Sequence, residues 1–540
     1  MLIRDGRIIP LIAFVSAVGL SAHAQPIVVM DDNTRVPRFV PRGYQHGERL
    51  RSTSFELVFS RDALAWHGQP VPGGGSLAPF FPGSPAINNN KGQIAFFSQV
   101  AGSVRNQGIF VADDAGLKPI ARGCGIGGGG GDPIATCGDV CPLGGTFSGM
   151  FSGTLFAPCI NDGGDVLFLS DIHGGPSIRG LFLYRHAEGD IISVAAIGQP
   201  SPMGGTISAV GPGSMNNGRR IVFLARNQGS DDTHIFLWAN GLLTKSVSVG
   251  DPAPGGGTFS ILAGESVGFL DGTEIPVGYV PDLNEANQIS FFGIVQGGMA
   301  ERGIFLSSNG THEWYLHEGQ PTPMGGTYIH FFAPILNNRA EIALLADVNL
   351  GGGVFTSAWI AGRPGQWRKA LTFFDKIEGE SVFVLAVSRN PINSLDDCGN
   401  LLAWYAIGPD GIEERLGVFS ANGRVDIVAR MGDLLPFGGQ LGPLEAWPSM
   451  NLLGQISFGA FTPGAARGPS AAIHSGIGNQ FGDSDNDLAV GLADFRRLED
   501  CFKGPEECPE FFGCRVFDND SDFDVDLSDL ATWQNAFSGL

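Results

Sequence analysis

The sequence predicts a mainly β protein, a seven-bladed β-propeller followed by a small helical module. Three observations lead to this fold. A turn rich in asparagine, followed by an apolar strand, recurs seven times along the chain. A segment near the start resembles the strand that the last repeat lacks, and from residue 479 onward acidic loops alternate with helical periodicity.

Each repeat combines a Pro/Gly turn, a short strand, an Asn-rich turn and further strands. The clearest copy starts with Gly-Gln-Pro-Thr-Pro-Met-Gly-Gly-Thr at 319–327. Asn and Gly tolerate the positive φ that a tight hairpin needs, and the Ile-x-Phe alternation after the turn points alternate side chains into the core. The turns begin at Asn89, Asn161, Asn216, Asn284, Asn337, Asp396 and Asn451.

The spacing of these turns, 53 to 72 residues, suits a four-stranded unit better than a leucine-rich or helical repeat. In the first repeat we expect strands at 76–81, 93–99, 108–112 and 117–121. Helical periodicity is absent from this region of the sequence. Each repeat is therefore predicted to be one blade, and the divergent repeat at Asp396 leaves the blade count open.

The two ends of the repeat region predict a closed ring. The last repeat has strands at 455–458 and 470–473 but no fourth strand, whereas the segment 63–70 resembles the fourth strands of other repeats. Closure removes the exposed edges of an open sheet. We therefore predict a propeller over 63–478 whose N-terminal strand completes the last blade, with an open β-solenoid or a pair of sandwiches as the alternative.

The N-terminus has the features of a signal peptide. Arg4 and Arg7 precede an apolar run from Ile8 to Leu20, and Ala22-His23-Ala24 fits a cleavage site. We expect a signal peptide over 1–24, an N-terminal extension over 25–62 and a mature chain that begins at Gln25. No later stretch reaches the ~20 apolar residues of a membrane span. The expected location is extracellular, on the cell surface or in the periplasm.

Export makes disulfide bonds possible. We expect two bridges among the first four cysteines, with a zinc site as the alternative. The C-terminal module has three cysteines, so one of them is expected to pair with Cys398 or to remain a free thiol. The eight cysteines are Cys124, Cys137, Cys141, Cys159, Cys398, Cys501, Cys508 and Cys514.

The repeats resemble a family of bacterial exported tandem-repeat proteins with an Asn-x-x-Gly-x-x-x-Ala-Phe (NxxGxxxAF) pattern. The best match, one residue short in its spacing, consists of Asn89, Gly92, Ala95 and Phe96. Other copies have Arg219, Asn287 and Ala340 at the Gly position. The resemblance covers about 63–475 and implies an exported, propeller-like domain of unassigned activity, with no catalytic residue.

Two acidic loops in the last part of the chain, 479–540, predict calcium sites. Each has oxygen donors at loop positions 1, 3, 5 and 12, and calcium takes six to eight oxygen ligands. Two calcium ions are expected, and mutual repulsion of the carboxylates couples folding to metal binding. The predicted ligands, with Ala489 and Asp524 acting through their carbonyls, are Asp483, Asp485, Asp487, Ala489, Asp494, Asp518, Asp520, Asp522, Asp524, Asp526 and Asp529.

A helix is expected after each loop, because apolar residues follow at helical spacing. Phe495, Leu498 and Phe502 share one helix face, as do Leu530, Trp533 and Phe537. The duplicated loop–helix unit resembles a type I dockerin, an EF-hand-like calcium-loaded adaptor. The resemblance implies a cohesin-like protein partner. The sequence departs from it with Leu488 and Phe523 in place of Gly at position 6, and with Leu492-Ala493 and Leu527-Ser528 in place of the usual Ser-Thr pair.

Charge and motifs narrow the classes of function. A formal net charge of −21 without a basic patch argues against nucleic acid as a partner. The sequence has no Gly-x-Ser-x-Gly elbow and no Walker loop. Asp251 and Asp433 occur at repeated Gly-Asp corners, where we expect their side chains to cap a turn.

Two functional hypotheses follow. In the first, the protein is an exported, non-catalytic binding or scaffold protein that its calcium module attaches to a protein partner or a cell surface. In the second, it is a dockerin-bearing carbohydrate-active enzyme, a glycoside hydrolase or lyase that degrades polysaccharide, which rests on module association alone. Catalytic residues are unassigned. Carboxylates from different blades that converge at one end of the channel would favour the second hypothesis.

Overall fold

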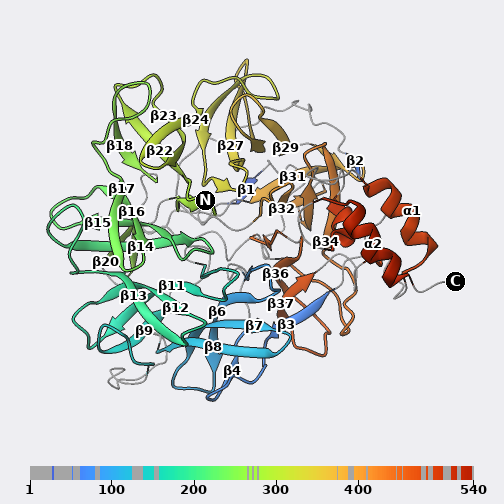
Figure 1. The fold of residues 1–540 in the computed structure, drawn as a ribbon, viewed down its shortest axis with the longest axis horizontal. Coiled ribbons are helices and arrows are strands. Elements are labelled where there is room, and N and C mark those ends of the chain that lie inside the picture. The colour runs from blue at the N-terminus through green and yellow to red at the C-terminus, as the bar shows by residue number, and fades with distance from the viewer. Residues whose placement is uncertain are drawn as a thin grey trace, which may run out of the picture.

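Seven β-sheets surround a central axis, and the helices lie outside this ring (Figure 1). The computed structural model describes residues 27–29, 51–52, 61–79, 86–124, 138–150, 157–263, 267–270, 273–276, 279–373, 375–386, 394–408, 412–444, 447–452, 454–475, 482–484, 490–502, 512–519 and 524–537. The predicted seven-bladed propeller is confirmed. The signal peptide predicted for 1–24 lies outside the described residues.

The strands follow the repeats of the sequence. Blades 1 and 2 contain β4 (Ser76–Leu77), β5 (Ile87–Asn88), β6 (Ile94–Ala101), β7 (Gln107–Asp113), β8 (Gly116–Gly123), β9 (Thr146–Met150), β10 (Cys159–Ile160), β11 (Val166–His173), β12 (Arg179–Arg185) and β13 (Asp190–Ala196). Blades 3 and 4 contain β14 (Ile207–Met215), β15 (Ile221–Asn227), β16 (Thr233–Ala239), β17 (Leu242–Val247), β18 (Thr258–Leu262), β21 (Asp282–Leu283), β22 (Ile289–Gln296), β23 (Arg302–Ser308) and β24 (Thr311–His317), next to the separate hairpin β19 (Val267–Leu270) and β20 (Thr273–Pro276).

The last three blades have the same antiparallel pattern. Blade 5 contains β25 (Thr327–Phe331), β26 (Ile335–Leu336), β27 (Ile342–Gly351), β28 (Val354–Gly362) and β29 (Arg368–Thr372). Blade 6 contains β30 (Lys376–Ile377), β31 (Glu380–Ala386), β32 (Leu401–Ile407), β33 (Glu413–Phe419) and β34 (Arg424–Arg430). Blade 7 contains β35 (Ser449–Met450), β36 (Ile456–Phe461) and β37 (Ser470–Ser475).

The first strand of a blade differs from its prediction. The sequence predicts one strand over 76–81, whereas β4 and β5 are two short pieces that both pair with β6. Blades 2, 4 and 5 are split in the same way. The second piece leads directly into the Asn turn, so in these four blades the turn begins where the second piece ends.

Paired phenylalanines fill the middle of four blades. The Phe of the Ile-x-Phe pattern lies directly opposite a Phe of the next strand, as in Phe96 and Phe110 or Phe291 and Phe305, whose ring centroids are 5.8 and 5.4 Å apart. All four of these rings are fully buried. The predicted alternation therefore builds the core, because direct cross-strand pairs of aromatic rings bury large apolar surfaces.

The chain start closes the ring. Strand β3 (Asp62–Trp66) pairs antiparallel with β37, with Ala63 opposite Ile473 and Trp66 opposite Ala471. This confirms that an N-terminal strand completes the last blade. The sequence did not predict a second use of the N-terminal region: β1 (Ile27–Val29) and β2 (Arg51–Ser52) pair in parallel with β31 and β34 of blade 6.

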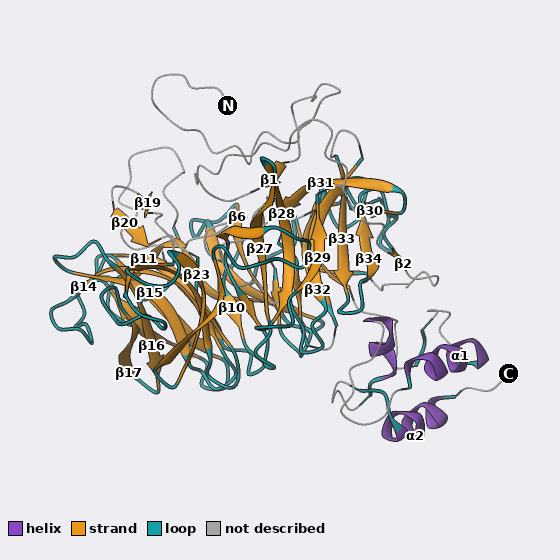
Figure 2. Cartoon of the chain, turned by 90° about the horizontal axis from the view of Figure 1, so that it is seen from above, coloured by secondary structure: helices purple, strands orange, loops and turns teal. Residues whose placement is uncertain are grey.

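The C-terminal module, here residues 482–537, contains helices α1 (Leu492–Cys501), η3 (Phe512–Phe517) and α2 (Leu527–Ala536), drawn in purple in Figure 2. Both predicted helices are present. Leu498 and Trp533 are buried in its apolar cluster, but Phe502, expected on the same face as Leu498, is 37% exposed just after α1 ends. Within the described part of the chain, no helix combines the length and the apolar character that crossing a membrane requires.

The cysteine predictions are partly wrong. Cys501 and Cys514 form a disulfide, and Cys124 and Cys398 are also disulfide-bonded. Cys141 and Cys159 are free thiols, so the two bridges expected among the first four cysteines do not form. Burial raises the pKa of the Cys159 thiol to about 12, which makes it inert. Cys137 and Cys508 lie outside the described residues.

Candidate functional site

The Asn turns meet around the central axis and form what we call the amide ring. In every turn the side-chain Oδ1 of the first residue accepts the backbone N–H four residues later, as Asn337 does from Glu341 at 2.8 Å. This bond closes the turn itself. All seven residues are buried: Asn89, Asn161, Asn216, Asn284, Asn337, Asp396 and Asn451.

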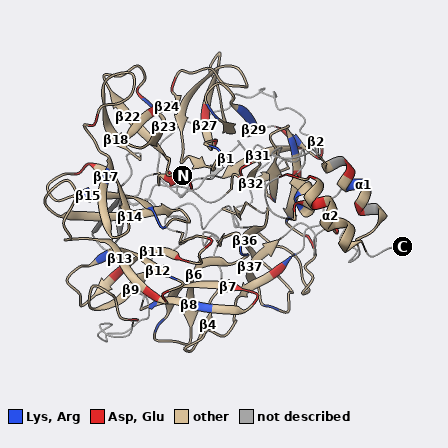
Figure 3. Cartoon of the chain, viewed as in Figure 1, with Lys and Arg blue, Asp and Glu red and all other residues tan. Residues whose placement is uncertain are grey.

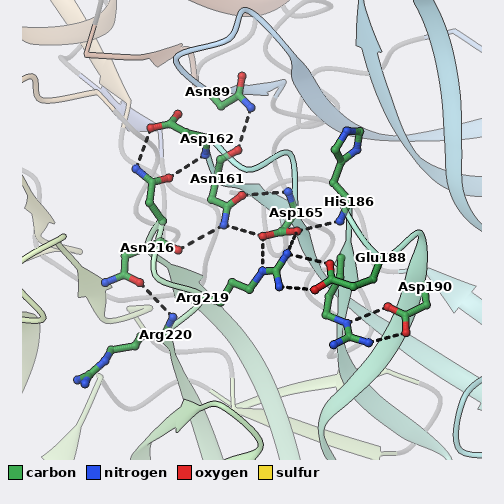
Figure 4. Close-up of polar contacts among 12 residues, drawn as sticks. Asn89, Asn161, Asp162, Asp165, His186, Glu188, Asp190, Asn216, Arg219 and Arg220 are labelled. Atoms are coloured by element: carbon green, nitrogen blue, oxygen red, sulfur yellow. Dashed lines mark hydrogen bonds and ion pairs between the residues drawn. The ribbon is translucent and has the colours of Figure 1, made fainter.

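The same side chains connect neighbouring blades. The Nδ2 of Asn89 donates to the backbone carbonyl of Asn161 at 2.8 Å, and Asn161 in turn donates to Asn216 (Figure 4). Corresponding bonds follow through blades 4, 5 and 6, and Asn451 donates to the carbonyl of Asn89 at 2.7 Å. Six of the seven seams between blades are bridged in this way.

The residue after each turn residue builds a second circle, the acceptor ring. Its backbone N–H donates to the side chain at the same position of the next blade, as Asn90 does to Asp162 at 2.8 Å and Asn338 to Asp397 at 2.7 Å. Six seams again carry this bond. The members are Asn90, Asp162, Asn217, Glu285, Asn338, Asp397 and Leu452.

The acceptor ring brings together carboxylates from three blades. Asp162 comes from blade 2, Glu285 from blade 4 and Asp397 from blade 6. Partial burial and the negative charges of Asp162 and Asp397 raise the pKa of Glu285 above its ordinary value. Burial likewise raises the pKa of Asp397. Carboxylates and amides in this arrangement can accept hydrogen bonds from hydroxyl groups, and a carboxyl group with a raised pKa can act as an acid.

An ion-pair network flanks the rings between blades 2 and 3 (Figure 4). Arg219 Nε donates to Asp165 Oδ2 at 2.7 Å, and Arg219 Nη1 donates to Glu188 at 2.8 Å. Burial alone would raise the pKa of Asp165, but hydrogen bonds from Arg219, from the N–H of His186 and from Asn161 bring this pKa below its ordinary value. The network holds the Asn161 turn against the next blade.

The Gly-Asp corners are capped turns, as predicted. Asp251 accepts the backbone N–H of Ser248 at 2.8 Å, and Asp433 accepts that of Arg430 at 2.9 Å. Each carboxylate is also paired with a cation, Lys245 for Asp251 and Arg61 for Asp433. These groups support the corners of blades, and their role is structural.

The structure brings three of the predicted calcium ligands together. Carboxylate oxygens of Asp524, Asp526 and Asp529 lie within 4.8 Å of one another, whereas Asp524 was predicted to bind through its backbone carbonyl. Asp483 and Asp494 are buried in the first loop, and Asp518 is almost fully buried in the second. Hard oxygen donors at this separation fit a calcium ion. The other predicted ligands, Asp485, Asp487, Ala489, Asp520 and Asp522, lie outside the described residues.

The two position-12 carboxylates have matching partners. Asp494 accepts the N–H groups of Ser484 and Gly491, and Asp529 accepts those of Asn519 and Asp526. In both loops the acceptor therefore ties positions 2 and 9 to the start of the following helix. This repetition supports the internal duplication that the sequence predicts.

Sequence reasoning missed both rings. The asparagines were interpreted as turn formers, which is correct, but their second role across the seams was not predicted. One signal was available: the same residue type recurs at a position where Gly or Asp would also form a turn, so the amide group itself must have a partner.

Comparisons with known proteins give little beyond the fold. A family of unknown function (DUF7453) matches residues 125–269, well under half of the chain. None of the curated protein sequences matches. Similar solved structures include an oligogalacturonate lyase from Vibrio parahaemolyticus (8% identity over 78% of this chain and 97% of that one, TM-score 0.38) and the polysaccharide lyase Uly1 (9%, 78% and 99%, TM-score 0.35). A puromycin-hydrolysing peptidase from Mycobacterium tuberculosis is 9% identical over 72% of this chain and 50% of that one, with a TM-score of 0.40. Similarity at this level identifies neither a shared activity nor a shared site.

Proposed function

We propose that the protein is an exported, calcium-binding β-propeller that binds or scaffolds other molecules and catalyses no reaction. The observation that carries this proposal is the bonding of the acceptor ring. Asp162, Glu285 and Asp397 each accept a backbone N–H from the preceding blade. A carboxylate that holds two blades together is a poor nucleophile or base, because moving it leaves a backbone donor unpaired.

The C-terminal module is proposed to be a dockerin-like adaptor loaded with two calcium ions, which attaches the propeller to a protein partner or a cell surface. The cluster of Asp524, Asp526 and Asp529 supports this, since three carboxylates so close together repel one another unless a cation lies between them. When bound, calcium would bring these side chains and the preceding loop into one coordination shell.

One observation favours the second candidate, a carbohydrate-active enzyme. The pKa of Glu285 is raised by partial burial and by the charges of Asp162 and Asp397, and glycoside hydrolysis uses an acid with a raised pKa beside a second carboxyl group. The candidate acid would be Glu285.

The experiment is a polysaccharide panel, scored together for retention and for release of reducing ends. The protein is the chain from Gln25 with calcium present, and the variants are Glu285→Gln and, as a control away from the rings, Glu301→Gln. We expect retention on one polymer without release. If the protein releases reducing ends, and if Glu285→Gln abolishes this release while Glu301→Gln preserves it, the scaffold proposal is contradicted. If the protein neither is retained on any polymer nor releases reducing ends, the binding partner is a protein and not a polysaccharide.

Calcium binding is tested separately by titration calorimetry. We expect two sites, and we expect Asp526→Asn to weaken one of them by about tenfold or more, because it removes one negative oxygen donor. An Asn at this position can still cap α2, as Asp526 does for Ser528. Glu499→Gln, on the exposed side of α1, is the matched control. Equal binding by all three proteins would contradict the predicted second site.

A further inference from the structure

The seam between blades 6 and 7 differs from the other six. The amide ring stops there because the turn residue of blade 6 is Asp396, which has no Nδ2 donor. The acceptor ring stops at the same seam, because Leu452 of blade 7 has no side-chain acceptor for the N–H of Asp397. Among the described residues, this is the seam that carries neither ring bond.

The C-terminal module packs at this seam. Arg515 of η3 donates from Nη2 to Asp396 Oδ2 at 3.0 Å, and the two side chains are 2% and 0% exposed. Phe512, one turn earlier in the same helix, is 1% exposed and belongs to the apolar cluster shared by blades 6 and 7, together with Leu402 and Phe458. Figure 1 shows α1 and α2 beside the sixth blade.

The propeller surface is shaped for this contact. Gly454 occupies the blade 7 position at which blades 3, 4 and 5 have Arg219, Asn287 and Ala340, whereas blades 1, 2 and 6 also have glycine there. A Cβ on Gly454 would lie 3.1 Å from the Phe512 ring and 3.5 Å from Arg515 Cγ. A Cβ at this turn would therefore press on η3, whose side chains would have to shift by a few tenths of an ångström. Glycine avoids this contact and also adopts the positive φ of 75°.

We propose that the C-terminal module is a built-in clasp, whose docking partner is the seam between blades 6 and 7 of its own propeller. Arg515 pairs with the carboxylate of Asp396, which stands where the other blades have an asparagine, and Phe512 covers the apolar core of the seam. Helix η3 also connects the two acidic loops: Gly482 donates to the carbonyl of Val516, and Asp518 lies 3.7 Å from Arg515.

Calcium is expected to strengthen this clasp. Asp518 is the first ligand of the second predicted loop, so a bound cation neutralises the carboxylate that competes with Asp396 for Arg515. This calcium step rests on the calcium binding proposed above, whereas the ion pair and the packing of Phe512 do not.

The test is a double-mutant cycle in the full chain from Gln25, with Asp396→Asn, Arg515→Gln and both changes together. Hydrogen–deuterium exchange is followed in the turn 396–400 and in η3. Arg515→Gln should raise exchange in both segments by about tenfold or more, because it leaves the buried carboxylate of Asp396 without its positive partner. Asp396→Asn should release η3 but keep the turn protected, because the new amide can donate to blade 7 as asparagines do at the other seams.

The double variant should match Asp396→Asn alone, since the pair is already broken. The ion-pair clasp would be overturned if the increases in exchange of the two single variants multiplied in the double variant. It would also be overturned if exchange in η3 were unchanged in the single variants. Phe512→Ala provides a second probe and should release η3 without a change of charge. The control Asn284→Asp puts an acid into the seam between blades 4 and 5, where its partner is Asn337 and not the turn of Asp396, and it should leave η3 protected. A chelator should raise exchange in η3 of the native chain; if calcium binds but its removal leaves η3 protected, the calcium step is wrong and the clasp stands.

Discussion

Each turn asparagine uses two atoms for two purposes. Its Oδ1 closes the local turn, and its Nδ2 reaches the carbonyl of the next blade, as Asn284 does at 3.1 Å to Asn337. An aspartate performs the first task and fails at the second, which is the situation of Asp396. The local task is visible in the sequence, because it concerns neighbours four residues apart.

The loss of one ring asparagine should destabilise the propeller. Asn284→Ala leaves the carbonyl of Asn337 and the N–H of Gln288 without these bonds, so we expect a loss of about 2–3 kcal/mol in the free energy of unfolding, measured in urea. Asn309→Gly, in an exposed hairpin turn with φ of 51°, is the control and should change stability little. Equal effects of the two changes would argue against the ring.

Three of the seven ring turns place a non-glycine residue in the left-handed region, namely Arg219, Asn287 and Ala340. Ala340 has φ of 59°, where the sequence pattern prefers Gly, and an alanine there costs about 1 kcal/mol. Ala340→Gly should therefore raise the free energy of unfolding by about 1 kcal/mol. The control Ala343→Gly, in buried β27, should lower it by about 1–2 kcal/mol, because it removes a packed methyl group and loosens a strand. A loss of stability in both variants would contradict strain at Ala340.

At the scale of elements, the seam between blades 6 and 7 is held by contacts that replace the rings. Glu414 of β33 accepts the N–H of Leu444 from blade 7 at 2.6 Å. Burial raises the pKa of Glu414 to about 7, against an ordinary value of 4.5. The folded protein thus holds a proton that the unfolded chain releases between these two values.

The burial of Glu414 should make stability depend on pH. The folded state binds the extra proton, so the contribution of Glu414 to the free energy of unfolding is largest below about pH 4.5. This contribution falls by roughly 1.4 kcal/mol per pH unit as the pH rises toward 7. Glu414→Gln should remove this dependence and be more stable than the native chain at pH 8, with a smaller difference at pH 5. Urea unfolding of both proteins at pH 5 and pH 8 measures this difference in stability. If the stability of both proteins changed equally between the two pH values, a group other than Glu414 would cause the pH dependence.

At the scale of the molecule, β3 joins the two ends of the propeller. Ala65 is fully buried and lies opposite Ala472 in the closing strand pair. Ala65→Asp buries an unpaired charge at this point and should lower the midpoint of thermal unfolding strongly. Asp62→Asn, an exposed change in the same strand, should leave the midpoint unchanged. A single transition that shifts as a whole would show that closure stabilises all blades together, whereas an unchanged midpoint would contradict the role of β3.

The sequence predicted the blades and their closure because both depend on local pattern. The turn at Asn337, the alternation around Phe96 and the strand missing after Ile473 are all readable within a few residues. The cysteine pairs among the first four were predicted wrongly, since proximity in the sequence does not fix proximity in space. The split first strand and the use of β1 and β2 in blade 6 were missed, because short pieces carry too few residues to show a period.

The sequence by itself determined the repeat, the strand that closes the ring and two acidic loops followed by helices. Only the tertiary structure decided which side chains meet at the centre and where the module docks. Ring partners in consecutive blades are 53 to 72 residues apart, those that join blade 7 to blade 1 are 362 residues apart, and Arg515 is 119 residues from Asp396. Hydrogen bonds need donor and acceptor within about 3 Å, so such pairs exist only once the blades are arranged around one axis.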